Sequence, residues 1–318
     1  MKVQTVCVLG GSGFVGHALV AQLANSGRKV RVLTRYRERC RELGVQSDVE
    51  LCQLDSFDKP TLTASFRGCD AVINLVGILN EDGSQRFTAL HAQLPATVAA
   101  ACVEAEVPRL LQMSALNADA ASGASDYLRS KGQGEDAAHA AAEHGVAVTS
   151  FRPSVIFGVG DSFFGRFATL LKLAPVLPLA CPNARFQPVY VEDVAAAFVA
   201  ALDDPRSFGQ RLDLGGPRTY TLKELVEYIA GVMGLKRLVI GLPDGLSRLQ
   251  ATLFEKLPGK PFTMDNYRSL QVDSVVSGSD GFALFGITPY SVEAIVPRAM
   301  KGRTARRDYD GFRYLAGR

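Results

Sequence analysis

The chain has 318 residues, of which 47% are hydrophobic, and its formal net charge is +3 at pH 7. This composition predicts a folded protein with a large apolar core, in one large domain or two unequal ones, and argues against disorder and against a nucleic-acid partner. The N-terminus enters a strand-like run directly and no apolar stretch reaches the roughly 18 residues that span a bilayer, so we expect a cytoplasmic protein, soluble or peripheral at the inner face of the membrane.

The first 152 residues alternate strand-like apolar runs with helical patterns, which is typical of βαβ units. Strands are expected at 3–9, 29–34, 49–54, 71–76, 109–114 and 146–151, and helices at 18–24, after 34, from 59, at 87–104 and at 127–144. Continuous apolar strands are typical of parallel sheets that are covered on both faces. The sequence therefore predicts an α/β fold with a doubly wound parallel sheet of the Rossmann type, as the domain formed by residues 1–152.

From residue 153 the rhythm loosens, with glycines and prolines between shorter elements. We expect residues 153–318 to form a smaller substrate-side lobe, interleaved with the main sheet. The segment from about 186 to 215 is predicted to return to that sheet, through a strand at 189–191 and a helix at 192–202. The last eighteen residues are basic and contain three aromatic residues, which is typical either of a frayed end or of a segment that binds acidic lipid or another subunit.

Six cysteines are scattered through the chain without a C-x-x-C pair, and several lie inside apolar runs. A reduced thiol in such a run behaves as a small hydrophobic side chain. We therefore expect neither a disulfide framework nor a metal site.

The most specific single motif is a glycine-rich turn between the first strand and the first helix, Gly10-Gly11-Ser12-Gly13-Phe14-Val15-Gly16. Gly11, Gly13 and Gly16 satisfy G-x-G-x-x-G, whose glycines permit the tight turn, the approach of a pyrophosphate and close packing of helix on strand. The unpaired N–H groups of the helix N-terminus attract the phosphates. All seven residues are predicted to bind a dinucleotide; the alternative is a turn that serves packing alone.

The end of the second strand indicates which dinucleotide is bound. An NAD site usually has an acidic residue about 20 positions after the glycines, but this chain has Thr34-Arg35 there. An arginine can hold a 2′-phosphate through charge-assisted hydrogen bonds, so NADP(H) is favoured over NAD(H). The alternative is that Arg35 and the arginines that follow form a solvated helix face paired with Glu38 and Glu42.

Two further pairs of residues follow strands on the same edge of the predicted sheet. Asp55 and Ser56 close the third strand, where the adenine of a dinucleotide would lie, although a plain turn explains these residues almost as well. Val76 and Gly77 close the fourth strand. We include all four among the candidate cofactor-binding residues.

Tyr127 and Lys131 are four residues apart and are therefore expected on one face of a helix. A tyrosine that exchanges protons near neutral pH needs its pKa lowered by roughly 3 units from about 10. A neighbouring ammonium supplies this at an effective dielectric of about 20, where a unit charge at 4 Å is worth roughly 4 kcal/mol. The spacing predicts an acid–base pair, while the same spacing also arises by chance on surface helices.

With these residues in view, the chain resembles the extended and atypical branch of the short-chain dehydrogenase/reductase superfamily. The resemblance extends over about two-thirds of the chain and rests on the glycine turn, Tyr127 to Lys131, and the segments 152–158, 191–195 and 214–217. It implies an NAD(P)-binding sheet with a C-terminal lobe over the cofactor, Tyr127 as the acid–base residue and Lys131 on the nicotinamide ribose. Pro153, Val155 and Ile156 would flank the nicotinamide.

One position departs from the pattern of that superfamily. Its epimerases and reductases usually carry a serine or threonine after the fifth strand, to orient the substrate oxygen beside the tyrosine. The best register puts Ala115 there and Ser114 one residue early. The catalytic serine position is therefore predicted to be lost, unless Ser114 serves through a small change in where the strand ends or Asn117 supplies the hydrogen bond.

Within the superfamily, the segments 114–118, 127–131 and 153–158 are most similar to the nucleotide-binding accessory subunit of respiratory complex I and its bacterial relatives. In that family the dinucleotide can be structural. Three hypotheses follow: an NADP(H)-binding oxidoreductase of this type, linked to quinone or respiratory metabolism; a nucleotide-sugar epimerase or dehydratase; and a non-catalytic assembly protein stabilised by NADPH. The partners implied are a dinucleotide, a small quinone-like substrate and a respiratory complex.

Two amphipathic segments, 163–180 and 242–257, combine large apolar residues with basic ones. Either could contact a membrane surface or a quinone. The favoured alternative for each is a helix of the substrate lobe with its apolar face on the core.

Overall fold

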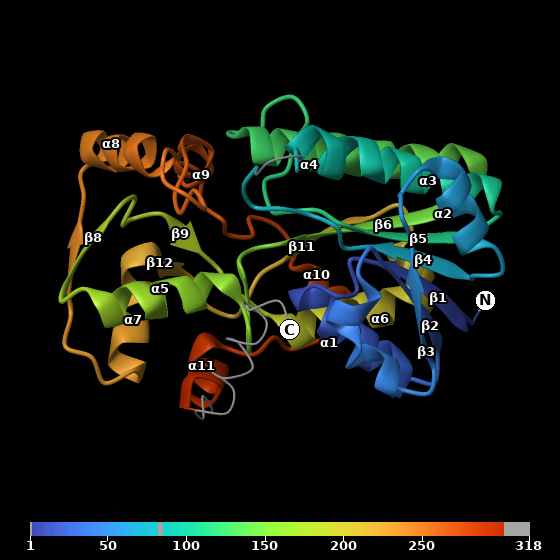
Figure 1. Ribbon diagram of the computed structural model, residues 1–318, viewed down its shortest axis with the longest axis horizontal. Coiled ribbons are helices and arrows are strands. Elements are labelled where there is room, and N and C mark those ends of the chain that lie inside the picture. The colour runs from blue at the N-terminus through green and yellow to red at the C-terminus, as the bar shows by residue number, and fades with distance from the viewer. Residues whose placement is uncertain (1, 82–84, 302–318) are drawn as a thin grey trace.

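The computed structural model describes residues 2–81 and 85–301, and the basic C-terminal segment lies outside the described residues. Its main feature is a seven-stranded parallel sheet in the order β11-β6-β5-β4-β1-β2-β3 (Figure 1). This confirms the predicted Rossmann-type α/β fold. The strands are β1 (Thr5–Leu9), β2 (Lys29–Thr34), β3 (Val49–Gln53), β4 (Ala71–Asn74), β5 (Arg109–Met113), β6 (Ala147–Pro153) and β11 (Arg211–Leu214).

Helices cover both faces of this sheet, as Figure 1 shows. Alternate residues of β1 serve the two faces: Val6 and Val8 belong to one apolar cluster, and Cys7 and Leu9 belong to the other. Residues of α1 and α6 join the first cluster, and residues of α2, α3 and α4 join the second. These helices are α1 (Phe14–Asn25), α6 (Val191–Asp203), α2 (Lys59–Phe66), α3 (Leu94–Glu104) and α4 (Asp126–His139).

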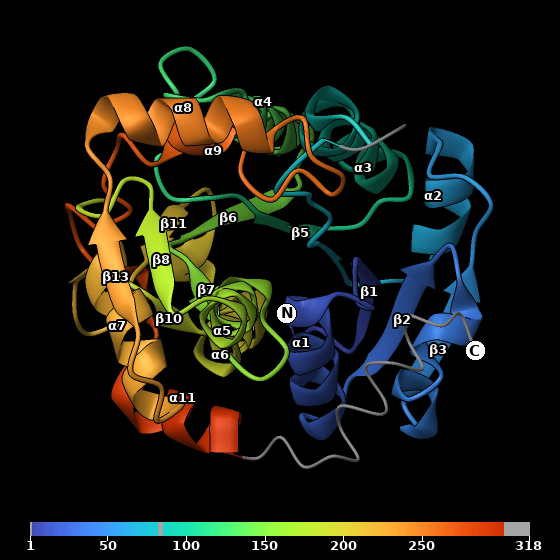
Figure 2. The same ribbon diagram turned by 60° about the vertical axis from the view of Figure 1, so that its left-hand side comes forward.

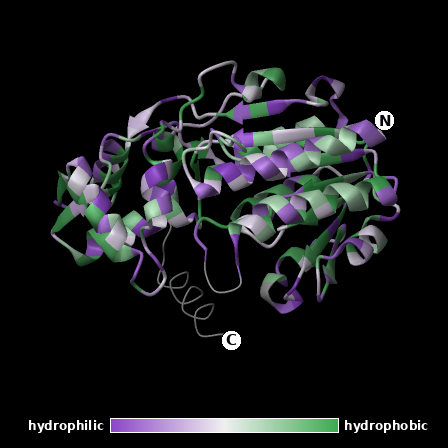
Figure 3. Ribbon diagram, turned by 90° about the horizontal axis from the view of Figure 1, so that it is seen from above, coloured by the Kyte–Doolittle hydropathy of each residue, from purple (hydrophilic) through white to green (hydrophobic). Residues whose placement is uncertain are grey.

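The helices of the structure mix hydrophobic and hydrophilic residues along their length, as Figure 3 shows. One predicted helix, at 87–104, differs in kind: its first part, Thr88–Gln93, is a π-helix and only then does α3 begin. Short 3₁₀ segments occupy Arg37–Cys40, Leu43–Val45, Ala140–His144 and Pro205–Ser207. No helix of the described residues is long and apolar enough to cross a membrane.

The remaining elements form a second lobe around a third apolar cluster (Figure 2). Three two-stranded sheets contribute to it: β7 (Ile156–Phe157) with β10 (Val189–Tyr190), β9 (Arg185–Phe186) with β12 (Tyr220–Thr221), and β8 (Val176–Leu179) with β13 (Leu238–Gly241). Its helices are α5 (Ser162–Leu173), α7 (Leu222–Val232), α8 (Asp244–Phe254), α9 (Met264–Ser269) and α11 (Val292–Lys301), while α10 (Gly281–Leu284) packs near β11.

The strand predicted at 189–191 does not join the main sheet, and this expectation was wrong. Val189–Tyr190 pairs with β7, and the strand that returns to the main sheet is β11, beside β6. The physical reason is length, since two residues of β10 provide too few backbone groups to extend a seven-stranded sheet. The helix that follows it, α6, does pack on that sheet.

A buried arginine ties the centre of the sheet to α6. Arg109 of β5 is 3% exposed and donates hydrogen bonds to the carbonyl oxygens of Ala147 and Ala201 and to the hydroxyls of Thr149 and Ser207. Burial lowers its pKa to about 9. Because the guanidinium donates to four acceptors that are buried or partly buried, its loss would weaken the hydrogen bonding of this cluster.

We expect Arg109→Ala to lower the free energy of unfolding by roughly 3 kcal/mol, because buried acceptors lose their donor. Urea unfolding followed by circular dichroism measures this change. The matched control is Arg206→Ala, which removes an exposed arginine paired with Asp204 and should leave the unfolding midpoint unchanged. Equal midpoints for the two variants would contradict the role assigned to Arg109.

Candidate functional site

The glycine turn leads from the carboxyl end of β1 to the N-terminus of α1. Gly10 has φ +77°, and a Cβ there would lie 3.1 Å from the backbone of Leu75 and Val76. A Cβ on Gly16 would overlap the backbone of Gly10 and Gly11. Both positions therefore require glycine.

The same turn leaves the N-terminus of α1 open to an anion. Gly13 is the N-cap residue and no side chain caps the helix. Ser12 and Gly13 are exposed, whereas Phe14 and Val15 are partly buried and pack against the core. Backbone N–H groups at a helix N-terminus bind phosphate, so the open turn suits the pyrophosphate of a dinucleotide.

Arg35 follows the last residue of β2 on the same edge of the sheet. It is exposed, with its guanidinium carbon 5.9 Å from the centre of the Tyr36 ring. None of the ion pairs found among the described residues includes Arg35, whereas Arg41 pairs with Glu38. The alternative of a solvated, paired helix face therefore applies to Arg41 and not to Arg35.

The other predicted cofactor residues lie on the same edge with different surroundings. Asp55 is exposed, and the Ser56 hydroxyl donates to the Asp58 carboxylate at 2.6 Å, which caps α2. The Val76 N–H donates to the side chain of Asn74. A Cβ on Gly77 would lie only 2.8 Å from the Lys131 ammonium, so glycine leaves room for that side chain.

Helix α4 carries Tyr127 and Lys131 one turn apart. Lys131 is 6% exposed, and its ammonium donates to the Met113 carbonyl at 3.4 Å. Burial lowers the pKa of Lys131 to about 8, although the Glu135 carboxylate acts in the opposite direction. Burial also raises the pKa of Tyr127 to about 12. The Tyr-x-x-x-Lys spacing predicts a lowered tyrosine pKa, whereas desolvation shifts the pKa of Tyr127 upward in this structure.

Two glycines allow α4 to pack backbone to backbone against its neighbours. A Cβ on Gly132 would collide with the backbone of Asp119 and Ala120, and a Cβ on Gly134 would collide with the carbonyl oxygen of His91. Gly132 therefore lets α4 approach the loop at 119–120, and Gly134, on a different face, lets it approach the π-helix.

His91, on the π-helix, is a site residue that sequence reasoning missed. It is 1% exposed, and its Nε2 accepts a hydrogen bond from the Ile78 N–H at 2.9 Å. Its Nδ1 therefore carries the proton and donates to the Ser130 hydroxyl at 3.1 Å, which in turn donates to the Tyr127 carbonyl. Burial and the charge of Lys131 lower the pKa of His91 to about 2, so the ring is neutral.

The His91 ring also packs against the side chain of Tyr127, with ring centres 5.4 Å apart in an edge arrangement. Phe87 stacks on the histidine ring, with ring centres 5.2 Å apart, and also lies 5.9 Å from the Tyr127 ring, so the three rings contact one another. Such aromatic contacts restrict ring orientation. His91 thus connects the loop after β4 to the aromatic ring of Tyr127.

Ser114 lies beside a buried ion pair. Its hydroxyl donates to Glu135 at 3.0 Å, and Arg152 donates two hydrogen bonds of 2.9 Å to the same carboxylate. Glu135 is fully buried. Ala115 is buried as well, and the Asn117 amide donates to the Asp273 carbonyl of the second lobe. The hydroxyl of Ser114 is therefore held by Glu135, and its catalytic role stays a prediction.

A carboxylate from the second lobe holds the first turn of α4. Asp265 of α9 accepts hydrogen bonds from the N–H groups of Asp126 and Tyr127 at 2.7 and 3.0 Å. The Ser269 hydroxyl donates to Ser125, the N-cap residue, at 2.8 Å. Asp265 and Tyr127 are 138 positions apart, and no local sequence pattern indicates a contact between them. Sequence reasoning therefore missed this contact too.

The predicted nicotinamide-side residues lie in the segment that joins the lobes. Pro153 is the last residue of β6, and its carbonyl accepts from the Leu116 N–H at 3.1 Å. Val155 accepts from the Val189 N–H, and Ile156 opens β7.

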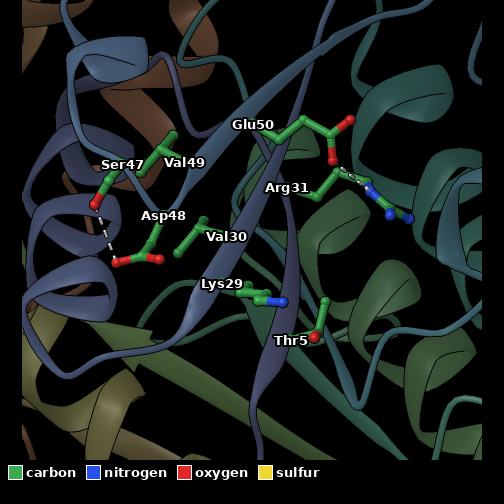
Figure 4. A pocket seen from close by; sticks show the side chains of 8 residues that line it. All are labelled: Thr5, Lys29, Val30, Arg31, Ser47, Asp48, Val49 and Glu50. Carbon is green, nitrogen blue, oxygen red and sulfur yellow. Dashed lines mark hydrogen bonds and ion pairs between the residues drawn. The ribbon is translucent and has the colours of Figure 1, made fainter.

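A hollow of about 220 Å³ lies at the opposite edge of the sheet (Figure 4). Thr5, Lys29 and Val49, which line it, are the first residues of β1, β2 and β3. The glycine turn and Arg35 follow the last residues of β1 and β2. The hollow is therefore separate from the dinucleotide site.

We expect Asp265→Ala to speed hydrogen exchange in the first turn of α4 about tenfold, because two charge-assisted hydrogen bonds to backbone N–H groups are lost. Mass spectrometry of peptides that contain residues 126–131 measures this. Asp265→Asn keeps an acceptor and should give a smaller increase. Peptides from α7 are the internal reference, and an equal increase there would show general loosening instead.

Comparisons with known proteins agree with this fold. A model of the NAD dependent epimerase/dehydratase family matches residues 6–215. The chain is 29% identical to the mitochondrial NADH dehydrogenase [ubiquinone] 1 alpha subcomplex subunit 9 of Mus musculus, over 97% of this chain and 81% of that protein. It is 32% identical to the ceramide reductase of Caulobacter vibrioides, over 75% of this chain and 74% of that protein.

Among solved structures, DesIV of Streptomyces venezuelae, a dTDP-glucose 4,6-dehydratase with NAD bound, superposes with a TM-score of 0.74. The two share 20% sequence identity, over 94% of this chain and 96% of DesIV. At this identity the likeness concerns the fold alone.

Proposed function

Because the chain belongs to the NAD-dependent epimerase/dehydratase family, we propose that it is an NADP(H)-dependent oxidoreductase that reduces a carbonyl group carried on an apolar molecule, such as a quinone or a lipid ketone. The observation that carries the proposal is the position on α4 of Tyr127 one turn before a buried Lys131. Both lie near the glycine turn, on the edge of the sheet where parallel strands end.

Each residue has a defined task in this reaction. The glycine turn and the N-terminus of α1 would hold the pyrophosphate, and Lys131 would bind the nicotinamide ribose. When bound, NADPH supplies the hydride that the carbonyl carbon accepts. Tyr127 donates its phenolic proton to the carbonyl oxygen, which becomes a hydroxyl, and regains a proton from water. His91 stays neutral and keeps the Tyr127 ring in place.

The preference for NADP(H) rests on the surroundings of Arg35. Its exposed guanidinium follows β2, where the ribose 2′ position of a bound dinucleotide would lie, and no carboxylate occupies that strand end. A fork of N–H donors suits a phosphate better than a hydroxyl.

The names of the relatives support the substrate class and the partner. One relative is a ceramide reductase and another is a subunit of a ubiquinone-reducing complex, and both names refer to apolar molecules. We therefore propose contact with a respiratory complex at the inner face of the membrane as the setting for this activity.

A non-catalytic role is the second candidate, because Ala115 takes the expected serine position and Ser114 is hydrogen-bonded to Glu135. In that case NADPH would be a structural part of an assembly protein. A nucleotide-sugar epimerase or dehydratase is the third candidate and rests on the fold and the family alone.

We expect Arg35→Ala to weaken NADPH binding about 10- to 100-fold and NADH binding by less than about threefold, because only NADPH loses a charge-assisted contact. Fluorescence titration of the reduced nicotinamide measures both affinities. Arg37→Ala, at a neighbouring exposed arginine, is the control. Equal losses for the two cofactors would show that Arg35 does not recognise the 2′-phosphate.

We expect Tyr127→Phe to lower the rate of NADPH oxidation at least about 100-fold while leaving NADPH affinity intact, because general-acid catalysis is lost. The rate is measured with quinones, ketolipids, enones and sugar nucleotides as acceptors, after the retained nucleotide has been identified by mass spectrometry. Tyr290→Phe, at an exposed tyrosine, is the control.

Three outcomes of that experiment separate the candidates. Oxidation with an apolar carbonyl that requires Tyr127 supports the proposal. Conversion of a sugar nucleotide would replace it with the third candidate. Absence of turnover with every acceptor, together with tight NADPH binding, would favour the structural role.

A further inference from the structure

The outer face of the β8–β13 sheet in the second lobe is apolar and open to solvent. Side chains alternate along each strand, and Leu177, Leu179 and Val239 are buried in the lobe. The outward positions are Val176, Pro178, Leu238 and Ile240, and the two strands bring them together in pairs. Leu238 is 59% exposed and Ile240 46% exposed. A sheet face that meets water usually carries polar residues. The outer face of β8 and β13 is therefore suited to contact an apolar surface.

Helix α8 adds a stripe of leucines to the same end of the lobe. Leu246, Leu249 and Leu253 are spaced by three and four residues and therefore lie on one helix face, and each is about half exposed. Leu257 follows just after the helix and is 47% exposed. The fold uses a different face of α8, because Ser247 and Ala251 are the buried residues. The apolar surface of α8 thus extends beyond the face that packs on the lobe, and its leucines are left about half exposed.

The two amphipathic segments found in the sequence both keep apolar side chains exposed. In α5, Phe163, Phe164 and Phe167 belong to the apolar cluster of the lobe, but Leu170 is 38% and Leu173 78% exposed. The segment 163–180 also contains Val176 and Pro178 of the outward sheet face. The exposed leucines of α8 lie outside that cluster.

These elements are adjacent in the chain and in space. β13 leads into α8 with two residues between them, and the Gln250 amide of α8 donates to the Pro178 carbonyl of β8 at 3.3 Å. Figures 1 and 2 show β8, β13 and α8 together at the end of the molecule farthest from β2 and β3. We call the outward residues of β8 and β13 and the leucines of α8 and Leu257 the apolar end face.

Positive charge is concentrated in the segments that form this face. Residues 162–182 and 235–260 contain seven Lys or Arg and two Asp or Glu, a formal charge of +5, whereas the whole chain carries +3. Outside these segments the chain is therefore slightly negative. The basic residues are Arg166, Lys172, Lys236, Arg237, Arg248, Lys256 and Lys260. The Lys260 ammonium donates to the Glu81 carbonyl of the first lobe, so the other six are the candidates for lipid contact.

We propose that the apolar end face docks on an anionic phospholipid bilayer, with its leucines and the outward residues of β8 and β13 in the headgroup layer and its basic residues near lipid phosphates. Apolar side chains flanked by Lys and Arg are the composition of surfaces that lie in a membrane interface. A second copy of the chain fits less well, because a two-fold contact would bring the same positive charges together. The surface is distinct from the dinucleotide site, so docking does not depend on catalysis.

Docking would also place lipid close to the elements that organise α4. The chain runs from α8 into α9, whose Asp265 holds the first turn of α4. A substrate dissolved in the bilayer would therefore reach the protein at the lobe that contacts the Tyr127 helix.

The test is flotation of the full-length chain with phosphatidylcholine vesicles, with and without about one third phosphatidylglycerol. We expect binding to the anionic vesicles only, and weakening in about 0.5 M salt, where the Debye length falls to a few ångströms.

Leu249→Gln with Leu253→Gln should weaken binding at least about tenfold. Lys236→Gln with Lys256→Gln should weaken it about fivefold for each charge removed. Val45→Gln, at an exposed valine in the 3₁₀ segment Leu43–Val45, should have no effect.

Other outcomes would overturn the proposal. Binding that is unchanged in the leucine pair but lost in Arg306→Gln with Arg307→Gln would assign the contact to the C-terminal segment. Equal binding to neutral vesicles would remove the role of charge. Failure to bind vesicles, with a dimer in light scattering that the leucine pair dissociates, would assign the face to a second copy. NADPH titration of each variant keeps this test separate from the proposed activity, since docking variants should retain full affinity.

Discussion

The arrangement of the candidate site depends on how closely α4 approaches its neighbours. Gly132 and Gly134 remove the two Cβ atoms that would otherwise collide with the loop at 119–120 and with the π-helix. This approach buries Lys131 and places His91 beside Tyr127. The carboxylate of Asp265 then fixes the helix at its N-terminus. Close backbone approaches and the Asp265 carboxylate together position α4 and its reactive groups.

That close packing also determines protonation. Removing three titratable groups from water keeps the Tyr127 phenol and the His91 ring in their neutral forms and weakens the hold of Lys131 on its proton. Because the Ile78 backbone N–H can only donate, His91 must accept from it at one nitrogen and donate to Ser130 from the other.

Much of the fold followed from the sequence because parallel strands and the glycine turn leave strong local signals. The strands at 29–34 and 71–76, for example, lie within two residues of their predicted ends. The strand at 189–191 was misplaced, because a short apolar run does not reveal which sheet it joins. His91 and Asp265 were missed because their partners lie far away in the chain, and the protonated state of Tyr127 depends on burial that spacing alone does not reveal. The exposure of the α8 leucines likewise depends on which helix face the lobe covers.

The π-helix at Thr88–Gln93 has an evolutionary consequence. A π-turn accommodates one residue more than an α-turn of the same length, and such turns are frequent at functional sites. Removing a single residue here would restore regular α-helical pitch and rotate His91 away from Ile78 and Tyr127 without disturbing α3 downstream. A one-residue deletion or insertion at this place, rather than a substitution, would therefore be an economical way for related chains to lose or acquire the histidine contact.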